Sequence, residues 1–296
     1  MNVAAELLAL AGDRRSIAVV GTSKNAGKTV VIAALCEEFV RRGETYGLLS
    51  VGRDGESVDA LEGTPKPRLF LREGTLFATA RPLVPAHPAA EVLASGTERG
   101  ALGTIVVARM RRPGFVEIAG PASAAGARRV VAALFALGAH RVAIDGAVDR
   151  STALRPEDAT IVATGAASGT TIAQVAEAAA GLVQRLALPV VDRDLPFIRH
   201  AGALSASAAL AYARAGERAQ ILVDDPTRVA IGGRSFSGIA RSLDLRVERT
   251  LTVIAATVAS AGPERAFEPR ALARAVARAT ALPVFDVYAA TASSAA

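Results

Sequence analysis

Two kinds of apolar segment alternate along the whole chain, and this alternation constrains the fold more than any other feature. Short runs rich in β-branched residues, such as 16–20 and 141–144, alternate with longer alanine-rich runs such as 172–186. Strands that alternate with helices in this way form parallel sheets covered by helices. The sequence therefore predicts an α/β fold, with a mostly parallel sheet and helices on both faces.

The predicted elements extend from one end of the chain to the other. Strands are expected at 16–20, 47–51, 115–118, 141–144, 160–163, 189–191, 219–223, 251–255 and 283–287. Helices are expected at 28–42, 123–137, 172–186, 203–215 and 269–279, and the first 15 residues are expected to form a short amphipathic helix. No linker divides the chain, so residues 1–296 are interpreted as a single domain.

Residues 52–103 interrupt this alternation, because they contain five prolines and several glycines. Such a stretch is typical of an irregular insertion, a β-hairpin over the sheet edge, or a switch-like functional loop. We expect any movement linked to function to occur there.

Composition restricts the class of protein. Hydrophobic residues make up 51% and charged residues 21% of the chain, and no apolar run approaches the roughly 18 residues of a membrane-spanning helix. The single cysteine, Cys36, lies in an apolar helical stretch and is interpreted as core packing. We therefore expect a soluble, cytoplasmic protein without a membrane partner.

The basic residues are scattered along the chain. The net charge is +6 and the pI 10.2, but few aromatic residues are interleaved with the basic ones, which argues against a nucleic-acid partner. Of 34 basic residues only Lys24, Lys28 and Lys66 are lysine. Because arginine serves almost everywhere else, these three places are expected to need a compact ammonium group.

A polar loop separates the first predicted strand from the helix that begins at Lys28, and its segment Gly21-Thr-Ser-Lys-Asn-Ala-Gly-Lys-Thr29 is typical of phosphate-binding loops. In such loops backbone N–H groups face phosphate oxygens, and the helix dipole adds positive potential. Lys28 would reach the β- and γ-phosphates, and the Thr29 hydroxyl would ligate Mg²⁺. We therefore expect ATP and Mg²⁺ as ligands. The predicted nucleotide contacts are Gly21, Thr22, Ser23, Lys24, Asn25, Ala26, Gly27, Lys28, Thr29 and Val30.

The strict phosphate-loop pattern has glycine where this chain has Thr22, and here the glycine stands one place earlier, at Gly21. The register Gly21-Thr22-x-x-x-x-Gly27-Lys28-Thr29 resembles that of dethiobiotin synthetases and cobyrinic acid diamide synthases. These belong to the deviant-Walker class, together with septum-site and partition ATPases. The resemblance implies a P-loop NTPase-type sheet. Lys24 lies four places before Lys28, whereas the signature lysine of partition ATPases lies five places before theirs.

A second resemblance covers most of the chain. The sequence is similar to a bacterial family associated with adenosylcobalamin-dependent lysine and ornithine aminomutases. The shared segments are GTSKNAGKT at 21–29, GRDGE at 52–56, TPKP at 64–67 and IDGAVDR at 144–150. This resemblance implies an ATP-driven reactivating role, with a cobalamin-dependent aminomutase as the protein partner.

Carboxylates that follow apolar runs are candidates for the magnesium shell. Asp145 ends the run Val142-Ala-Ile and is predicted to bind a Mg²⁺-bound water; capping of a turn is the alternative. Asp54 follows the second strand, where deviant-Walker proteins carry an aspartate that orients water or binds metal, although Asp54-Gly55 is also a turn dipeptide. Glu117 is a further candidate, because it is predicted to lie inside an apolar strand.

Arg53 and Lys66 are expected to contact a partner or substrate. Lys66 stands in the stiff segment Thr64-Pro-Lys-Pro67, soon after the second strand, where switch loops follow the nucleotide state. A plain surface lysine is the alternative.

The leading interpretation is a slow ATPase that acts as an accessory or reactivating factor for a partner enzyme. An ATP-dependent ligase or kinase-like enzyme that activates a small carboxylic acid is the alternative, and a nucleotide sensor without useful hydrolysis is a third class. ATP is expected over GTP, because the guanine-binding segment Asn-Lys-x-Asp needs a lysine and none follows Lys66. A homodimer is left open.

Overall fold

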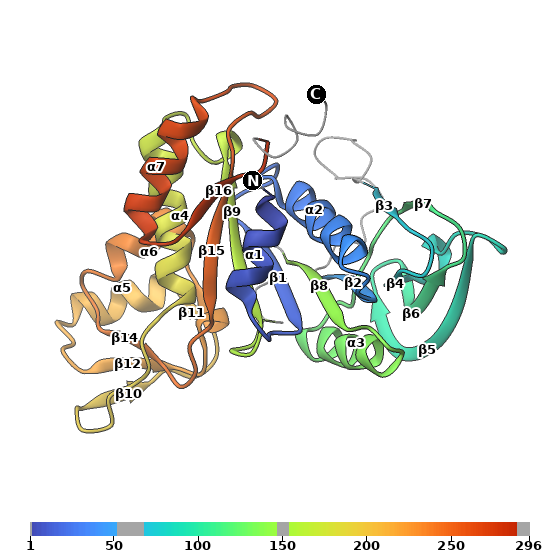
Figure 1. Ribbon diagram of the computed structural model, residues 1–296. Helices are drawn as coiled ribbons and strands as arrows, with labels where there is room; N and C mark the ends of the chain where they lie inside the picture. Colours follow the sequence, from blue (N-terminus) through green and yellow to red (C-terminus); the bar gives the residue numbers. More distant parts are fainter. Residues whose placement is uncertain (1, 52–67, 147–153, 289–296) are drawn as a thin grey trace. The chain divides into compact units, whose positions relative to one another are not determined.

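The computed structural model describes residues 2–51, 68–146 and 154–288 (Figure 1). The chain is an α/β protein whose strands are mostly parallel. It divides into two compact units, which are described separately. The N-terminal unit comprises Ala4–Val19 and Lys28–Ala153, and the C-terminal unit comprises Met1–Val3, Val20–Gly27 and Leu154–Ala296. Strand β1 (Ser16–Gly21) contributes to both, because its last two residues belong to the C-terminal unit.

The sheet of the N-terminal unit changes from parallel to antiparallel toward one edge. Its strand order is β1, β8 (Arg141–Gly146), β2 (Tyr46–Val51), β4 (Leu76–Ala80), β6 (Gly103–Met110) and β5 (Ala90–Gly100). The first four strands are parallel, and β4, β6 and β5 pair antiparallel. Every residue of β1 and of β2 is buried, which is typical of parallel strands that are covered on both faces.

Helices α2 (Lys28–Arg41) and α3 (Ala124–Ala136) cover opposite faces of this sheet. The Tyr46 ring of β2 packs against Phe39 of α2, with 5.3 Å between ring centroids. A methyl group on the next residue, Gly47, would meet Leu134 of α3. Because neighbouring residues of a strand point to opposite faces, α2 and α3 lie on different sides. The expectation of helices on both faces is therefore confirmed for this unit.

Cys36 is buried in α2, as expected of a core residue. Burial raises the pKa of its thiol to about 12, although a hydrogen bond with Tyr46 acts in the opposite direction. A buried thiol with a raised pKa has little thiolate at neutral pH, which agrees with a packing role for Cys36.

The region predicted as irregular or as a hairpin contains regular strands over residues 68–103. After β3 (Leu69–Leu71), which pairs with β7 (Gly114–Val116), strand β4 enters the sheet, and β5 and β6 form a long hairpin. The prolines of this part gather in the connection 81–89, which includes the short 3-10 helix η1 (Arg81–Leu83), so they do not interrupt the ladders. Residues 52–67 lie outside the described part of the chain.

In the C-terminal unit, β16 (Val284–Asp286), β15 (Val253–Ala259) and β9 (Ala159–Gly165) form parallel pairs in that order. The end of β1 lies beside β9, since the Thr22 N–H donates to the Ala163 carbonyl over 2.9 Å. Helices α4 (Ile172–Leu186) and α7 (Pro269–Thr280) pack on these strands and lie side by side (Figure 1).

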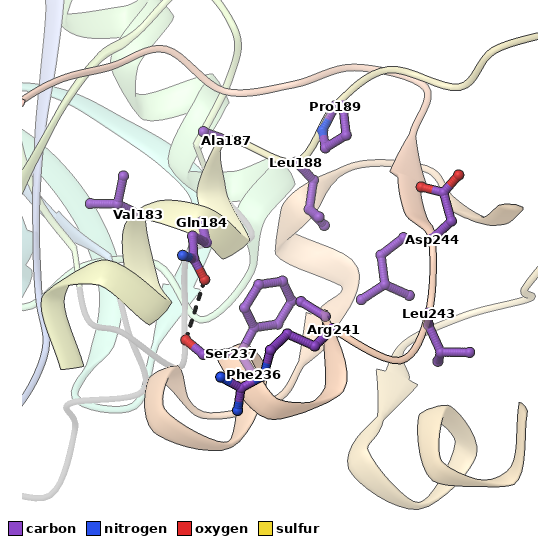
Figure 2. Close-up of a pocket in the computed structure, with 12 residues that line it drawn as sticks. Val183, Gln184, Ala187, Leu188, Pro189, Phe236, Ser237, Arg241, Leu243 and Asp244 are labelled. Carbon is purple, nitrogen blue, oxygen red and sulfur yellow. Dashed lines mark hydrogen bonds between the residues drawn. The ribbon is translucent and has the colours of Figure 1, made fainter. Parts of the chain in front are cut away.

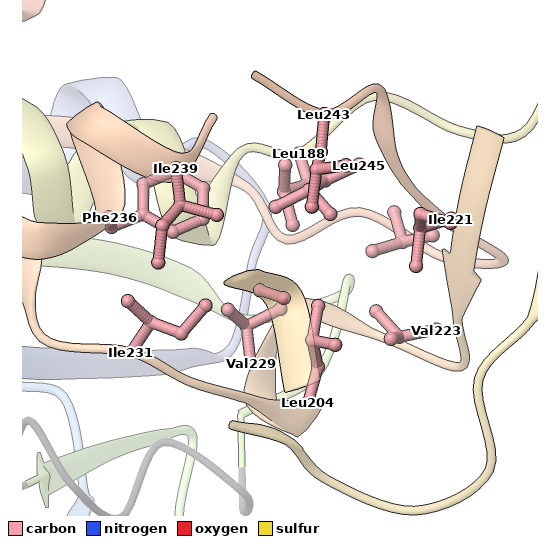
Figure 3. Packing of buried hydrophobic residues seen from close by; sticks show 12 residues of the cluster. Leu188, Leu204, Ile221, Val223, Val229, Ile231, Phe236, Ile239, Leu243 and Leu245 are labelled. Carbon is pink, nitrogen blue, oxygen red and sulfur yellow. The ribbon is translucent and has the colours of Figure 1, made fainter. Parts of the chain in front are cut away.

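Residues 187–250 of the same unit build a second, smaller sheet. Its parallel strands are β10 (Phe197–Arg199), β12 (Gln220–Val223) and β14 (Leu245–Val247), and the short strands β11 (Leu204–Ser205) and β13 (Val229–Ala230) pair beside them. Helices α5 (Ala206–Arg214) and α6 (Gly233–Ile239) complete it. Its core gathers side chains of Leu204, Ile221, Val229 and Phe236 (Figure 3).

One sequence prediction in this segment was wrong, and one helix was not predicted. Residues 189–191 form no strand and contribute a single bridge, between Val190 and Val247. Helix α6 was missed because its sequence Gly-Arg-Ser-Phe-Ser-Gly-Ile has low helix propensity. Burial of Phe236, which is fully shielded from solvent, overrides that propensity. The other predicted helices are present within a few residues of their expected ends, including α1 (Val3–Ala11). Among the described residues, no helix has both the length and the apolarity to cross a membrane.

Replacing Gly47 by alanine tests the packing of α3 on the sheet. The new methyl group would lie 3.0 to 3.1 Å from carbon atoms of Leu134. Gly47→Ala is therefore expected to lower the free energy of unfolding by about 1 to 3 kcal/mol, as overpacking does. Leu134→Ala removes the close contacts with Cδ1 and Cδ2 and keeps only the one with Cβ, so in that background the same change should cost at least about 0.5 kcal/mol less. Urea denaturation of the four proteins measures both values.

Gly96→Ala is the control, because a methyl group there would lie an ordinary 3.8 Å from the nearest atom, the Glu98 nitrogen. Its effect should stay within about 0.5 kcal/mol. Equal losses for Gly47→Ala with and without Leu134 would contradict the placement of α3.

Candidate functional site

The loop 21–27 leaves the carboxyl end of β1, and α2 begins at the next residue, Lys28. Two of its residues have left-handed backbone angles, Asn25 with φ of 59° and Gly27 with φ of 93°. Turns that include left-handed residues can direct successive N–H groups toward one anion. Ala26 is buried between them and anchors the loop, while Lys24 and Asn25 are exposed.

Gly27 is required for two reasons. Its φ of 93° is strained for any other residue, and a Cβ atom there would lie 3.0 Å from the Ala259 Cβ atom and 3.7 Å from Val287. The loop therefore passes close to the carboxyl ends of β15 and β16 within the C-terminal unit.

A chain of hydroxyl groups holds the start of the loop. Thr22 Oγ1 lies 2.9 Å from Thr164 Oγ1 and 2.6 Å from Ser168 Oγ, and Ser168 Oγ lies 2.9 Å from Ser23 Oγ. Because each hydroxyl has one proton, a consistent arrangement is donation from Ser168 to Thr22 and from Thr22 to Thr164, while the Ser23 proton goes either to Ser168 or to the Lys24 carbonyl oxygen 3.0 Å away. Such chains polarise each other, and Thr164 and Ser168 are buried.

The loops after β9 and β15 approach each other at the same edge. A Cβ atom at Gly165 would lie 2.6 Å from the Ala259 carbonyl oxygen. Arg265 donates to the Gly169 carbonyl over 3.2 Å, which ties the second loop to the first. Helix α4 then begins with the N-cap Thr171, whose side chain accepts from the Gln174 N–H, while the Gln174 side chain accepts from the N–H of Thr170, the residue before the cap. Ligands of open α/β sheets bind outside the carboxyl ends of strands, where these loops lie.

In the N-terminal unit, Asp145 stands near the carboxyl end of β8. Its register partners are Val19 of β1 on one side and Ser50 of β2 on the other. Lys28 and Thr29 are half-buried at the beginning of α2, which packs on β8 and leads into β2. Because β1 and β2 both run parallel to β8, the helix that connects them must start at the carboxyl edge, where Asp145 lies.

Glu117 lies directly after β7, not inside a strand as predicted. Its carbonyl oxygen accepts from Thr79 Oγ1 over 2.9 Å, and Thr79 accepts in turn from the Ala119 N–H. The loop then passes so tightly over the end of β2 that a Cβ atom at Gly120 would lie 1.6 Å from the Ser50 carbonyl oxygen. Ser50 is also the register partner of Asp145, so the loop that carries Glu117 passes over the edge of the N-terminal unit at which Asp145 lies.

Arg53, Asp54 and Lys66 lie outside the described residues. Within the described ranges, no group of three or more histidine, cysteine, aspartate or glutamate residues is arranged to hold a metal ion. The sequence analysis missed the supporting positions Thr164, Ser168 and Gly120. A signal for the first two was present in the hydroxyl-rich run Thr-Gly-Ala-Ala-Ser-Gly-Thr-Thr, which follows a buried strand.

In comparisons with known proteins, the sequence matches no protein-family model, no curated protein and no solved structure.

Ser168→Ala tests the hydroxyl chain. The substitution removes two hydrogen bonds and leaves Thr22 and Ser23 without this partner, so the free energy of unfolding is expected to fall by about 1 to 3 kcal/mol. Ser242→Ala, at an exposed serine of the same unit, should change it by less than about 0.5 kcal/mol. Urea denaturation measures both, and equal small effects would show that the network does not hold the loop.

Proposed function

We propose that this protein binds ATP with Mg²⁺ through the segment Gly21–Thr29 and hydrolyses it slowly, as an accessory factor of a partner enzyme. One observation carries the proposal. A loop with left-handed residues Asn25 and Gly27 joins a buried parallel strand to a helix of 14 residues that begins at Lys28. The N–H groups at such a helix start and the helix dipole favour phosphate.

The side chains available near the carboxyl edge of the N-terminal unit suit Mg²⁺, which prefers hard oxygen ligands. Thr29 offers a hydroxyl, and Asp145 and Glu117 offer carboxylates. Mg²⁺, when bound, would neutralise charge on the β- and γ-phosphates. We assign Thr29 to direct ligation and Asp145 to a water of the metal shell, while Glu117 is the second carboxylate of this edge.

Lys28 is assigned to the phosphates as a compact, mobile cation, which stabilises the charge that develops during phosphoryl transfer. Val30 and the loop residues from Gly21 onward are assigned to nucleotide contact through their backbone. Asp54, outside the described residues, is proposed to orient the attacking water.

The accessory role rests on the resemblance to the aminomutase-associated family. We propose a protein partner, contacted by Arg53 and Lys66, and ATP in preference to GTP. Slow turnover suits such a role, because the nucleotide state must last long enough to act on the partner.

Lys28→Ala is expected to leave the fold intact and to weaken ATP binding at least about tenfold, because a charge-assisted phosphate contact of roughly 1.5 kcal/mol or more is lost. Lys28→Arg keeps the charge but not the compact shape. Its affinity for ATP should therefore lie between that of the unmodified protein and that of Lys28→Ala. Titration with a fluorescent ATP analogue measures the dissociation constants. Arg214→Ala, at an exposed arginine of α5, removes the same charge and serves as the control. Affinity within twofold of the unmodified protein for Lys28→Ala would refute the phosphate assignment.

Asp145→Asn keeps the shape of the side chain and removes its charge. We expect ATP to bind still, Mg²⁺ to lose its effect on ATP affinity, and Mg²⁺-dependent hydrolysis to fall about tenfold or more. Phosphate release and ATP titrations with and without Mg²⁺ provide two independent readouts. Asp194→Asn, at an exposed aspartate, is the control. An unchanged Mg²⁺ dependence would move the metal role to Glu117 or Asp54.

A further inference from the structure

A cavity of about 580 Å³ opens beside α6 in the C-terminal unit (Figure 2). The last turn of α4, the segment that follows it, α6 and the beginning of β14 form its walls. Most of the lining is apolar, with side chains of Val183, Leu188, Pro189, Phe236 and Leu245. A cavity of this size with a mainly apolar wall and few polar groups is typical of small-molecule sites.

The polar groups on one side of the cavity are arranged as donors. Ser237 Oγ donates to Gln184 Oε1 over 3.3 Å, which orients the Gln184 amide and leaves its NH₂ group as a donor (Figure 2). Arg241, in the turn that follows α6, is exposed and also lines the cavity (Figure 2). Among the described residues, no carboxylate forms an ion pair with its guanidinium group.

The one carboxylate in the lining is already neutralised. Asp244 accepts from Arg246 over 2.6 and 3.3 Å, and it is drawn on the opposite side of the cavity from Gln184 and Ser237 (Figure 2). Two carbonyl groups at the helix ends are also occupied, since Val183 accepts from the Ala187 N–H and Ile239 accepts from the N–H groups of Ser242 and Leu243. The charge left for a ligand is therefore that of Arg241, which is positive.

We propose that this cavity binds a small aliphatic carboxylate, with its hydrocarbon part against the apolar wall and its carboxylate between Arg241 and the Gln184 amide. Arginine suits this task, because its fork of donors matches both oxygens of a carboxylate. The apolar chain would lie against Ala187, Pro189 and Ala240, the apolar lining residues that are not buried.

This site is separate from the loop 21–27. Helix α4 begins next to Gly169, close to the Ser168 hydroxyl, and its last turn lines the cavity, so about 22 Å of helix separates the two places. Binding of a carboxylate in this cavity therefore does not depend on nucleotide binding at the loop 21–27.

Calorimetric titration of the full chain with hexanoate, hexanol and hexylamine tests the proposal. We expect hexanoate to saturate one site and to bind at least about tenfold more tightly than the other two probes, because only the carboxylate pairs with Arg241. Arg241→Gln should weaken hexanoate binding about tenfold, whereas Arg218→Gln, at an exposed arginine after α5, should leave it unchanged.

Ala187→Phe is a second variant. This exposed alanine lines the cavity, and the phenyl ring of phenylalanine would fill the cavity without altering any charge. We expect hexanoate binding to be lost while the melting temperature changes little. Absence of saturable binding, tighter binding of hexylamine, or an unchanged dissociation constant in Arg241→Gln would each overturn the proposal. Displacement of hexanoate by ATP would place the carboxylate at the loop 21–27 and would overturn it as well.

Discussion

The burial of β1 and its parallel pairing with β8 are the constraint on which the other features of this protein depend. A buried strand must satisfy each backbone group within the sheet, so its register cannot shift without exposing polar groups or breaking the ladder. The register sets Val19 opposite Asp145 and determines where the chain leaves the sheet. The loop 21–27 begins at that exit and leads directly to Lys28.

Close packing of backbone at the carboxyl ends of strands depends on residues without large side chains. Gly27 and Gly165 approach Ala259 in the C-terminal unit, and Gly120 passes over Ser50 in the N-terminal unit, each at distances that exclude a larger side chain. Side-chain hydroxyl groups form further hydrogen bonds at the start of the loop 21–27, as between Thr22 and Ser168. Small residues thus bring the loops near the strand ends, and short hydrogen bonds hold them there.

The segment 187–250 has a core of its own. A cavity can therefore form at the last turn of α4, at the end of that helix away from the loop 21–27. Buried Arg185 of α4 donates to the Ile231 carbonyl over 3.0 Å, which connects the helix to the loop before α6. Apolar side chains such as Phe236 and Leu245 fill the interior, and these buried residues also lie at the base of the cavity. The side chains that pack the small sheet therefore also determine the shape of the proposed carboxylate site.

The sequence alone determined the features that depend on local pattern. The α/β class, α2, α3, α4 and α7, the strands β1, β2, β8 and β9, and the position of the polar loop before Lys28 follow from periodicity and from the order of strand, loop and helix. Tertiary structure decided the rest. Helix α6 forms against its propensity because Phe236 is buried, and residues 90–110 form a hairpin at the edge of the sheet although prolines precede them. The partners Thr164 and Ser168 lie more than 140 residues from the loop that they hold, and only the pairing of distant strands brings them to it.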